Sequence, residues 1–269
     1  MLPGLLHQFA AAAAGWFAFT FFSYGLIAGG AYWLLWVRGS ERWRHKRIPA
    51  DRRRKPRPWD EFWLSVLLFA MFAAMLGGVR VLTELGWTRM YDDIGRHGIG
   101  YFAASILIIA VVHDTYYYWA HRLMHSKLLF RRVHRVHHQF TNPTPFASYA
   151  FHPFEGVIEL AIIGVLLLVM PIHPWGLGIY FLGLTVLNVV SHLGYEFYPA
   201  WVSRWFITST HHNLHHARFH GHYMLYFNVW DRLMGTNQAD YHAICERLAQ
   251  AEPGTEAQVS PIASGVRVG

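Results

Sequence analysis

Long uncharged stretches alternate with short charged ones along the first two thirds of the chain. Residues 9–37 and 62–79 carry no formal charge, and residues 98–112 continue the pattern into a stretch that ends near residue 120. A helix needs about 20 apolar residues to cross a bilayer. Three spanning helices are therefore expected, over 9–37, 62–79 and 98–120. A cleaved signal peptide is disfavoured at the start, because the apolar run is too long and no basic residue precedes it.

A fourth apolar stretch is interrupted by proline. Residues 160–195 contain no formal charge, but Pro171 and Pro174 break the run. Proline removes a backbone donor and clashes with the preceding turn of a helix. We expect a helical hairpin over 157–192 with PIHP as its turn, and whether its short first limb crosses fully is left open.

The pattern as a whole predicts an all-α, polytopic integral membrane bundle. No internal repeat or separate soluble domain is evident, so we expect a single membrane domain over residues 1–250. Residues 251–269 are small and polar, which is typical of a flexible tail.

Composition supports the membrane assignment. Hydrophobic residues make up 54% of the chain and charged residues 14%, whereas an average soluble domain has about 25% charged residues. The single cysteine, Cys245, excludes a disulfide framework, a cysteine zinc site and an iron–sulfur cluster.

The net charge of +7 is concentrated in one loop. Residues 38–58 hold ten lysines and arginines, and a short basic loop beside a span is typical of the cytoplasmic side. Contact with anionic lipid headgroups is compatible with that location, and no nucleic-acid partner is expected. Counting spans from this loop places residues 121–155 and 196–269 on the same cytoplasmic face.

Histidines form three sets at helical spacing on that face. The chain has 19 histidines, and the sets are HRLMH, HRVHH and HNLHH. Residues three or four apart lie on one face of a helix, so each set can direct imidazoles towards a common ion. Eight candidate ligands are too many for one ion and favour two metals with four or five ligands each. These ligands are His121, His125, His134, His137, His138, His212, His215 and His216.

The ligand type narrows the chemistry. Nitrogen ligands suit zinc, copper, iron and nickel, whereas a closed structural zinc site needs four ligands. The H-E-x-x-H and G-x-S-x-G patterns of metalloproteases and serine hydrolases are absent. Paired redox metals beside a bilayer indicate oxygen activation on a lipid. A metal transporter, the alternative from another class, should place ionisable residues within its spans, whereas these sets lie beyond them.

Residues between the histidines supply further candidates. Asp114 precedes His121 by about two helical turns, and we expect it to accept the free ring N–H of a ligand histidine; pairing with Arg122 is the alternative. Tyr118, in the same stretch, is a further catalytic candidate. Glu155 and Glu196 are weaker candidates for the role given to Asp114.

Four stretches together resemble the sterol desaturase / fatty acid hydroxylase superfamily of membrane di-iron enzymes. They are DTYYYWAHRLMH (114–125), FRRVHRVHHQFTNPTPFASYAFHPFE (130–155), NVVSHLGYE (188–196) and HHNLHHARFHGHYMLYFNVWDRLMGT (211–236), about half of the chain. The resemblance implies two iron ions that activate O₂ to remove hydrogen from an unactivated C–H bond. It implies nine ligands: His121, His125, His134, His137, His138, His192, His212, His215 and His216.

The resemblance also implies secondary positions. Some members have a histidine where this chain has Asn188, which is expected to bind weakly, to bind through water, or to leave a position for O₂. His152 and His211 match recurrent family histidines and rank next.

The expected reaction is hydroxylation of an acyl chain, a sterol or a related lipid. Desaturation by the same site stays open, because both reactions begin with the same hydrogen abstraction. Zinc can substitute for iron in a purified sample. Electrons are expected from an external donor, such as cytochrome b5, a ferredoxin or a reductase, and residues 38–58 are a candidate docking loop. The short chain favours a bacterial inner-membrane enzyme.

Overall fold

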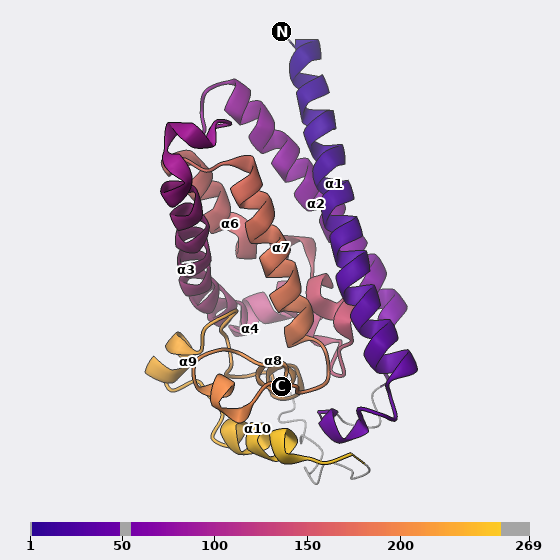
Figure 1. Cartoon of the computed structure of the whole chain (residues 1–269). Coiled ribbons are helices and arrows are strands. Elements are labelled where there is room, and N and C mark those ends of the chain that lie inside the picture. The colour runs from indigo at the N-terminus through magenta and orange to yellow at the C-terminus, as the bar shows by residue number, and fades with distance from the viewer. Residues whose placement is uncertain (1, 49–54, 254–269) are drawn as a thin grey trace.

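The computed structural model describes residues 2–48 and 55–253 as one helical assembly (Figure 1). Within those ranges no strand forms, and two isolated antiparallel bridges pair Arg47 with Tyr195 and Phe206 with Phe227. The prediction of an all-helical membrane protein is confirmed. Part of the basic loop (49–54) and most of the expected tail (254–269) lie outside the described residues.

Four described helices are long and apolar enough to cross a membrane. Their lipid-facing character shows in exposed side chains such as Phe22 and Leu107, which are 70% and 67% exposed; exposed apolar faces of this kind mark a membrane-contacting surface. The helices are α1 (Leu2–Tyr32), continued by the π-helix η1 (Trp33–Arg38), α2 (Pro58–Glu84), α3 (Gly98–Met124) and α7 (Pro174–Ser191).

The region expected as a hairpin forms α6 (Pro153–Val169) and α7. Both helices begin with a His-Pro pair: His152 and His173 are the N-caps, and each accepts a hydrogen bond through Nδ1 from the backbone amide two residues later. The following proline sits in the first turn, where its missing N–H costs nothing. At 17 residues, α6 is about 26 Å long.

The hairpin turn is fixed at the far end of the bundle. His173 Nε2 lies 3.0 Å from the carbonyl of Asp92, and the Tyr101 hydroxyl donates to the carbonyl of Pro171 at 2.9 Å. Residues 89–101 lead into α3 through the short helix η3 (Ile94–Arg96). The turn between α6 and α7 therefore lies at the end of the bundle where α3 begins, and α7 runs from there towards α8 (Figure 1).

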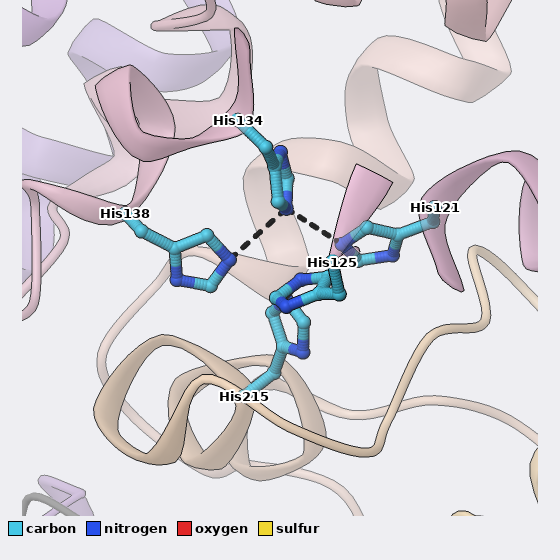
Figure 2. A group of neighbouring side chains, drawn as sticks. All are labelled: His121, His125, His134, His138 and His215. Atoms are coloured by element: carbon cyan, nitrogen blue, oxygen red, sulfur yellow. Dashed lines mark hydrogen bonds between the residues drawn. The ribbon is translucent and has the colours of Figure 1, made fainter. Parts of the chain in front are cut away.

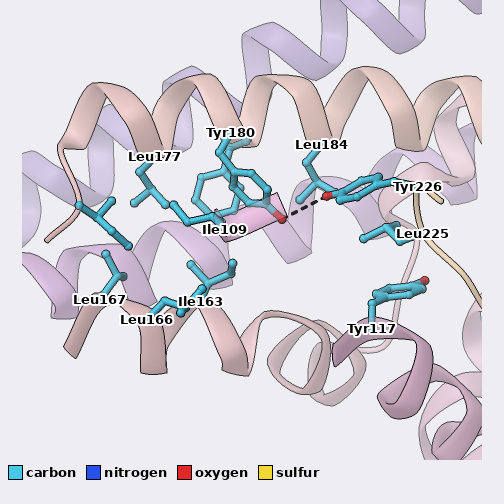
Figure 3. Packing of buried hydrophobic residues seen from close by; sticks show 12 residues of the cluster. Ile109, Tyr117, Ile163, Leu166, Leu167, Leu177, Tyr180, Leu184, Leu225 and Tyr226 are labelled. Carbon is cyan, nitrogen blue, oxygen red and sulfur yellow. Dashed lines mark hydrogen bonds between the residues drawn. The ribbon is translucent and has the colours of Figure 1, made fainter. Parts of the chain in front are cut away.

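The main core fills the space between α3, α6 and α7 (Figure 3). Ile109 from α3, Ile163 from α6 and Leu177 from α7 are buried there. Tyr226, from the C-terminal part of the chain, reaches the same cluster. α1 packs closely on α2, because a Cβ at Gly77 would lie 2.9 Å from the carbonyl oxygen of Phe9.

Short helices gather at the end of the bundle where α1, α3 and α7 finish (Figure 1). All three histidine sets therefore meet at one end of the molecule. The helices are η2 (Arg44–Lys46), α4 (Lys127–Leu129), the π-helix η4 (Phe130–His134), α5 (Arg135–His138), η5 (Pro145–Tyr149), η6 (Ala200–Arg204), α8 (Ser209–Arg218), α9 (Val229–Leu233) and α10 (Tyr241–Gln250).

Candidate metal centre

Nine histidines from four parts of the chain converge beneath the bundle. α3 supplies His121 in its last turn and His125 at its C-cap, and His192 is the C-cap of α7. The remaining six come from the two short helical segments η4–α5 and α8. Eight of the nine are buried, and His125 is half-buried.

These histidines separate into two adjoining groups. In each group, one nitrogen from every ring lies within 4.8 Å of the corresponding nitrogens of the others. The two groups adjoin, since the rings of His138 and His216 have centroids 5.0 Å apart. The first group contains His121, His125, His134, His138 and His215 (Figure 2); the second contains His137, His192, His212 and His216.

Each H-x-x-H-H motif contributes to both groups. In HRVHH the first and last histidines, His134 and His138, join the first group, while His137 joins the second. In HNLHH the assignment is reversed, with His215 alone in the first group. On a helix, residues four apart differ by about 40° around the axis, and adjacent residues by about 100°. The spacing therefore pairs the outer histidines and turns the middle one towards the neighbouring group.

In three of the rings, the nitrogen that faces the group centre carries a lone pair. Nδ1 of His121 lies 3.0 Å from the carbonyl of Tyr223, and Nδ1 of His215 lies 2.7 Å from the carbonyl of Gly221. His192 makes the same contact with the carbonyl of Asn188 at 2.8 Å. A carbonyl only accepts, so each Nδ1 carries the hydrogen of a neutral ring and each Nε2 is bare.

Burial keeps the rings neutral. Loss of solvent, reinforced by neighbouring histidines, lowers the pKa of His137, His138 and His216 well below the ordinary value. Burial lowers the pKa of His192 to about 4. Neutral imidazole is the form that binds metal ions.

The nitrogen positions fit a bound cation. Lone pairs directed at a common buried point repel one another unless a positive ion lies between them. Nε2 of His134 lies 3.0 Å from Nε2 of both His121 and His138 (Figure 2), and His212 Nε2 lies 3.0 Å from that of His192. Two nitrogens bound about 2.1 Å from one ion and about 90° apart are separated by about 3.0 Å. All-nitrogen sets of five and four suit transition metals such as iron or zinc.

Glu155 orients one ring of the first group. Its Oε1 lies 2.7 Å from Nδ1 of His134, and both side chains are fully buried. A carboxylate on the outer ring nitrogen fixes the tautomer and raises the basicity of the inner one. Glu196 instead accepts from the backbone amides of Tyr198 and Thr210 and thereby holds the start of α8.

Asp114 acts on the backbone and not on a histidine. It was expected to accept a ring N–H, but its oxygens accept from the backbone amides of Tyr226 and Phe227, at 2.7 and 3.4 Å. It therefore fixes the segment 221–227, whose carbonyls orient His121 and His215.

Sequence reasoning did not single out Asp231, which fixes the other end of that segment. Its carboxylate accepts from the backbone amides of Tyr223 and Met224, both at 3.0 Å, and from the hydroxyl of Thr236 at 2.6 Å. Nε2 of His211 lies 3.1 Å from the same carboxylate. Burial would raise the pKa of Asp231, but the hydrogen bonds from His211 and Thr236 outweigh it and lower that pKa. A lone acid inside the aromatic and apolar run of residues 223–234 was the available signal.

The other candidates lie outside the two groups. His211 contacts Asp231, and His152 caps α6. The Tyr118 hydroxyl contacts the Thr236 hydroxyl and receives a hydrogen bond from Arg122, both at 3.1 Å. Asn188 orients His192 through its backbone carbonyl. The structure thus brings together the nine histidines expected as ligands and places His152, His211, Tyr118 and Asp114 around them.

Comparison with known proteins matches the chain to one family model and to several named enzymes. The family described as fatty acid hydroxylase matches residues 106–236. Lathosterol oxidase of Homo sapiens is 32% identical over 65% of this chain and 56% of its own length. Methylsterol monooxygenase 1 of Rattus norvegicus is 33% identical over 72% of this chain and 68% of its own length.

A Delta(7)-sterol 5(6)-desaturase of Gibberella zeae is 27% identical over 81% of this chain and 65% of its own length. The chain spans little more than half the length of the lathosterol oxidases that it matches. No solved structure matches it significantly.

Proposed function

Because the chain belongs to the sterol desaturase / fatty acid hydroxylase superfamily, we propose that it is an O₂-dependent oxygenase that hydroxylates an unactivated C–H bond of a membrane lipid. The convergence of nine buried histidines into groups of five and four carries this proposal. Two iron ions, one in each group, would supply the oxidising chemistry when bound, with O₂ as co-substrate. Zinc would compete for the same nitrogens in a purified sample.

Residues of the chain orient the rings of both groups and shield them from water. Carbonyls of Gly221, Tyr223 and Asn188 fix three rings with Nδ1 protonated, and Glu155 fixes a fourth. Eight of the nine rings are buried, which limits the access of water to the two sites. Fixed, preorganised ligands reduce the rearrangement that a reaction would otherwise require.

We place the histidine groups on the cytoplasmic side. Described residues of the basic loop lie at the same end of the bundle as α8 and α10, because Lys46 Nζ donates to the carbonyls of Leu248 and Ala249 at 2.7 and 2.8 Å. The positive-inside rule assigns that end to the cytoplasm. An external electron carrier with an acidic surface would therefore approach from this side. The relatives named above come from eukaryotes. We therefore propose the cytoplasmic orientation of the histidine groups, and we do not propose a bacterial inner membrane.

Desaturation is the second candidate, favoured by the match to a sterol desaturase. The experiment that separates the two is expression of the chain in a lipid-producing host, followed by mass spectrometry of the lipid extract. A lipid that gains one oxygen supports hydroxylation, and one that loses two hydrogens supports desaturation. His137→Ala should abolish either product, and full activity in that variant would contradict the proposed second group. An unchanged lipid extract from cells containing the folded, iron-loaded protein and its reductant would contradict both reactions.

A further inference from the structure

Exposed cations gather at the end of α3 and along the short helices that follow it. Between Asp114 and Glu155 the sequence contains no acidic residue, and both of these acids are buried. Among the described ion pairs, none includes Lys127, Arg132 or Arg135. The positive charge of this segment is therefore not balanced by acids of its own. The exposed cations are Arg122, Lys127, Arg131, Arg132 and Arg135.

The segment 122–138 has two different sides. On the inner side, the rings of His125, His134 and His138 point towards one another in the first histidine group (Figure 2). On the outer side, Leu123 and Leu128 lie among the cations and are 61% and 58% exposed. Lysine and arginine can bury their stems against an apolar phase while their charged ends stay in the polar layer. An outer side that combines exposed leucines with cations therefore suits the boundary between hydrocarbon and headgroups.

The lipid-facing surface of α3 leads directly to these cations. Leu107, Val111, Trp119 and Leu123 are exposed and recur at multiples of four residues along α3. Residues four apart differ by about 40° around a helix, so these side chains form one stripe that winds slowly around it. Tryptophan is enriched where a span meets the headgroups. Trp119 therefore marks the level of the membrane surface, and the cations that follow it lie at the level of the headgroups.

We propose that the outer side of residues 122–135 is a docking surface for anionic phospholipids of the surrounding bilayer. The lipid phosphates accept hydrogen bonds from Arg132 and Arg135, whose forked donors match phosphate oxygens, and the acyl chains cover Leu123 and Leu128. An acidic protein would pair with the cations, but the two leucines continue the apolar stripe of α3, and lipid covers all of these at once. This docking requires neither a bound metal nor the proposed reaction.

The strength of the preference follows from the charges. A lysine or arginine close to an anionic membrane surface contributes about a fivefold factor in affinity. Several cations share this face, so its preference for an anionic over a zwitterionic phospholipid should be about tenfold or more.

A fluorophore at residue 128 can report which lipids lie beside this face. Leu128→Cys in a Cys245→Ser background gives a single labelling site, and nitroxide-labelled lipids quench a fluorophore only at short range. The full, metal-free chain is placed in phosphatidylcholine nanodiscs that contain equal amounts of nitroxide-labelled phosphatidylglycerol or phosphatidylcholine, labelled near the headgroup. Quenching should show the preference for phosphatidylglycerol. A fluorophore on Leu107→Cys, within the span, should show no preference when the nitroxide lies near the chain end.

Two matched variants test the cations. Arg132→Gln/Arg135→Gln should lower the preference at residue 128 by about fivefold or more, whereas Arg132→Lys/Arg135→Lys should keep it. The control is Arg89→Gln/Arg96→Gln, which removes two exposed charges at the end of the bundle where α3 begins. It should leave the preference at residue 128 unchanged.

Salt gives a test that needs no change to the cations. Raising the salt concentration from about 0.1 M to about 1 M shortens the screening length from about 10 Å to about 3 Å, so the preference at residue 128 should fall severalfold. A preference that salt leaves unchanged, or an equal preference in Arg132→Gln/Arg135→Gln and its control, would overturn the proposal. Equal quenching by the two lipids at residue 128 would also overturn it, and would leave the exposed cations to an acidic protein.

Discussion

The contact between Glu155 and His134 gives the sharpest test of the first histidine group. Burial raises the pKa of Glu155, whereas a cation bound to His134 would favour its ionised form. Glu155→Gln keeps the shape of the side chain and one oxygen that can accept from Nδ1, but removes the negative charge that the bound ion would favour. Oε1 of Glu155 and Nδ1 of His134 are 2.7 Å apart, and neither side chain has exposed surface. Solvent therefore cannot replace the lost interaction.

The expected effect follows from the change in bond type. A hydrogen bond to a charged group contributes about 1.5–3 kcal/mol and a neutral one about 0.5–1.5 kcal/mol. The substitution should therefore remove about 1–1.5 kcal/mol of metal binding at the first group, which corresponds to roughly a fivefold to tenfold weaker affinity. The upper limit of this estimate meets the lower limit of the about 10–100-fold loss typical when a carboxylate behind a ligand histidine is removed.

Cobalt(II) titration of the metal-free protein measures this effect, because visible absorption reports each ion as it binds. Two binding steps are expected, of which Glu155→Gln weakens one. The matched control is Glu61→Gln: Glu61 is equally buried, accepts from the backbone amide and the hydroxyl of Thr144, and contacts neither histidine group. Unchanged affinity in Glu155→Gln, or an equal loss in Glu61→Gln, would refute the assigned role of Glu155.

Four further outcomes are expected. Asp231→Asn should weaken the cobalt step of the first group more than that of the second, because Asp231 fixes the segment whose carbonyls orient His121 and His215; equal weakening of both steps would contradict this. His152→Ser should keep both cobalt steps, because His152 is an N-cap and serine can replace it there; loss of a step would make His152 a ligand. The thermal midpoint of the metal-free protein should fall as the pH drops below about 6.5. In the unfolded chain the histidines then bind protons, whereas in the folded protein the lowered pKa values of buried His137, His138 and His216 keep these rings neutral. A midpoint independent of pH between about 7.5 and about 5.5 would count against neutral, buried rings. A cysteine introduced at Lys127 in a Cys245→Ser background should react with a membrane-impermeant thiol reagent only after the cells are opened, and one at Arg89 before; the reverse pattern would invert the proposed topology.

The helical architecture could be predicted because each span is a long apolar run with a clear break. The hairpin could be located from Pro171 and Pro174, because a proline cannot continue a helix. The structure adds that His152 and His173 cap the two limbs. Each of these histidines precedes a proline. Their positions in the sequence did not show whether they cap a helix or lie beside the metal ligands.

The grouping of the histidines could be predicted only in part. Helical spacing indicates which side chains share a face, and it placed eight of the nine in three sets; His192 followed only from the family resemblance. Spacing cannot show which set meets which, since that depends on how α3, α5, α7 and α8 pack. The roles of Asp114 and Asp231 could not be predicted for a similar reason. Asp114 binds a backbone amide that is distant in sequence, and Asp231 binds backbone amides, which every residue except proline carries.

The alternation of the two H-x-x-H-H motifs has a mechanical consequence. α5 and α8 each hold rings on both sides of the boundary between the groups, so neither centre has a scaffold of its own. A shift of either helix changes both sets of nitrogens at once. Any event that orders one pocket therefore stiffens the frame on which its neighbour is built, and the two pockets are expected to assemble and to fail together.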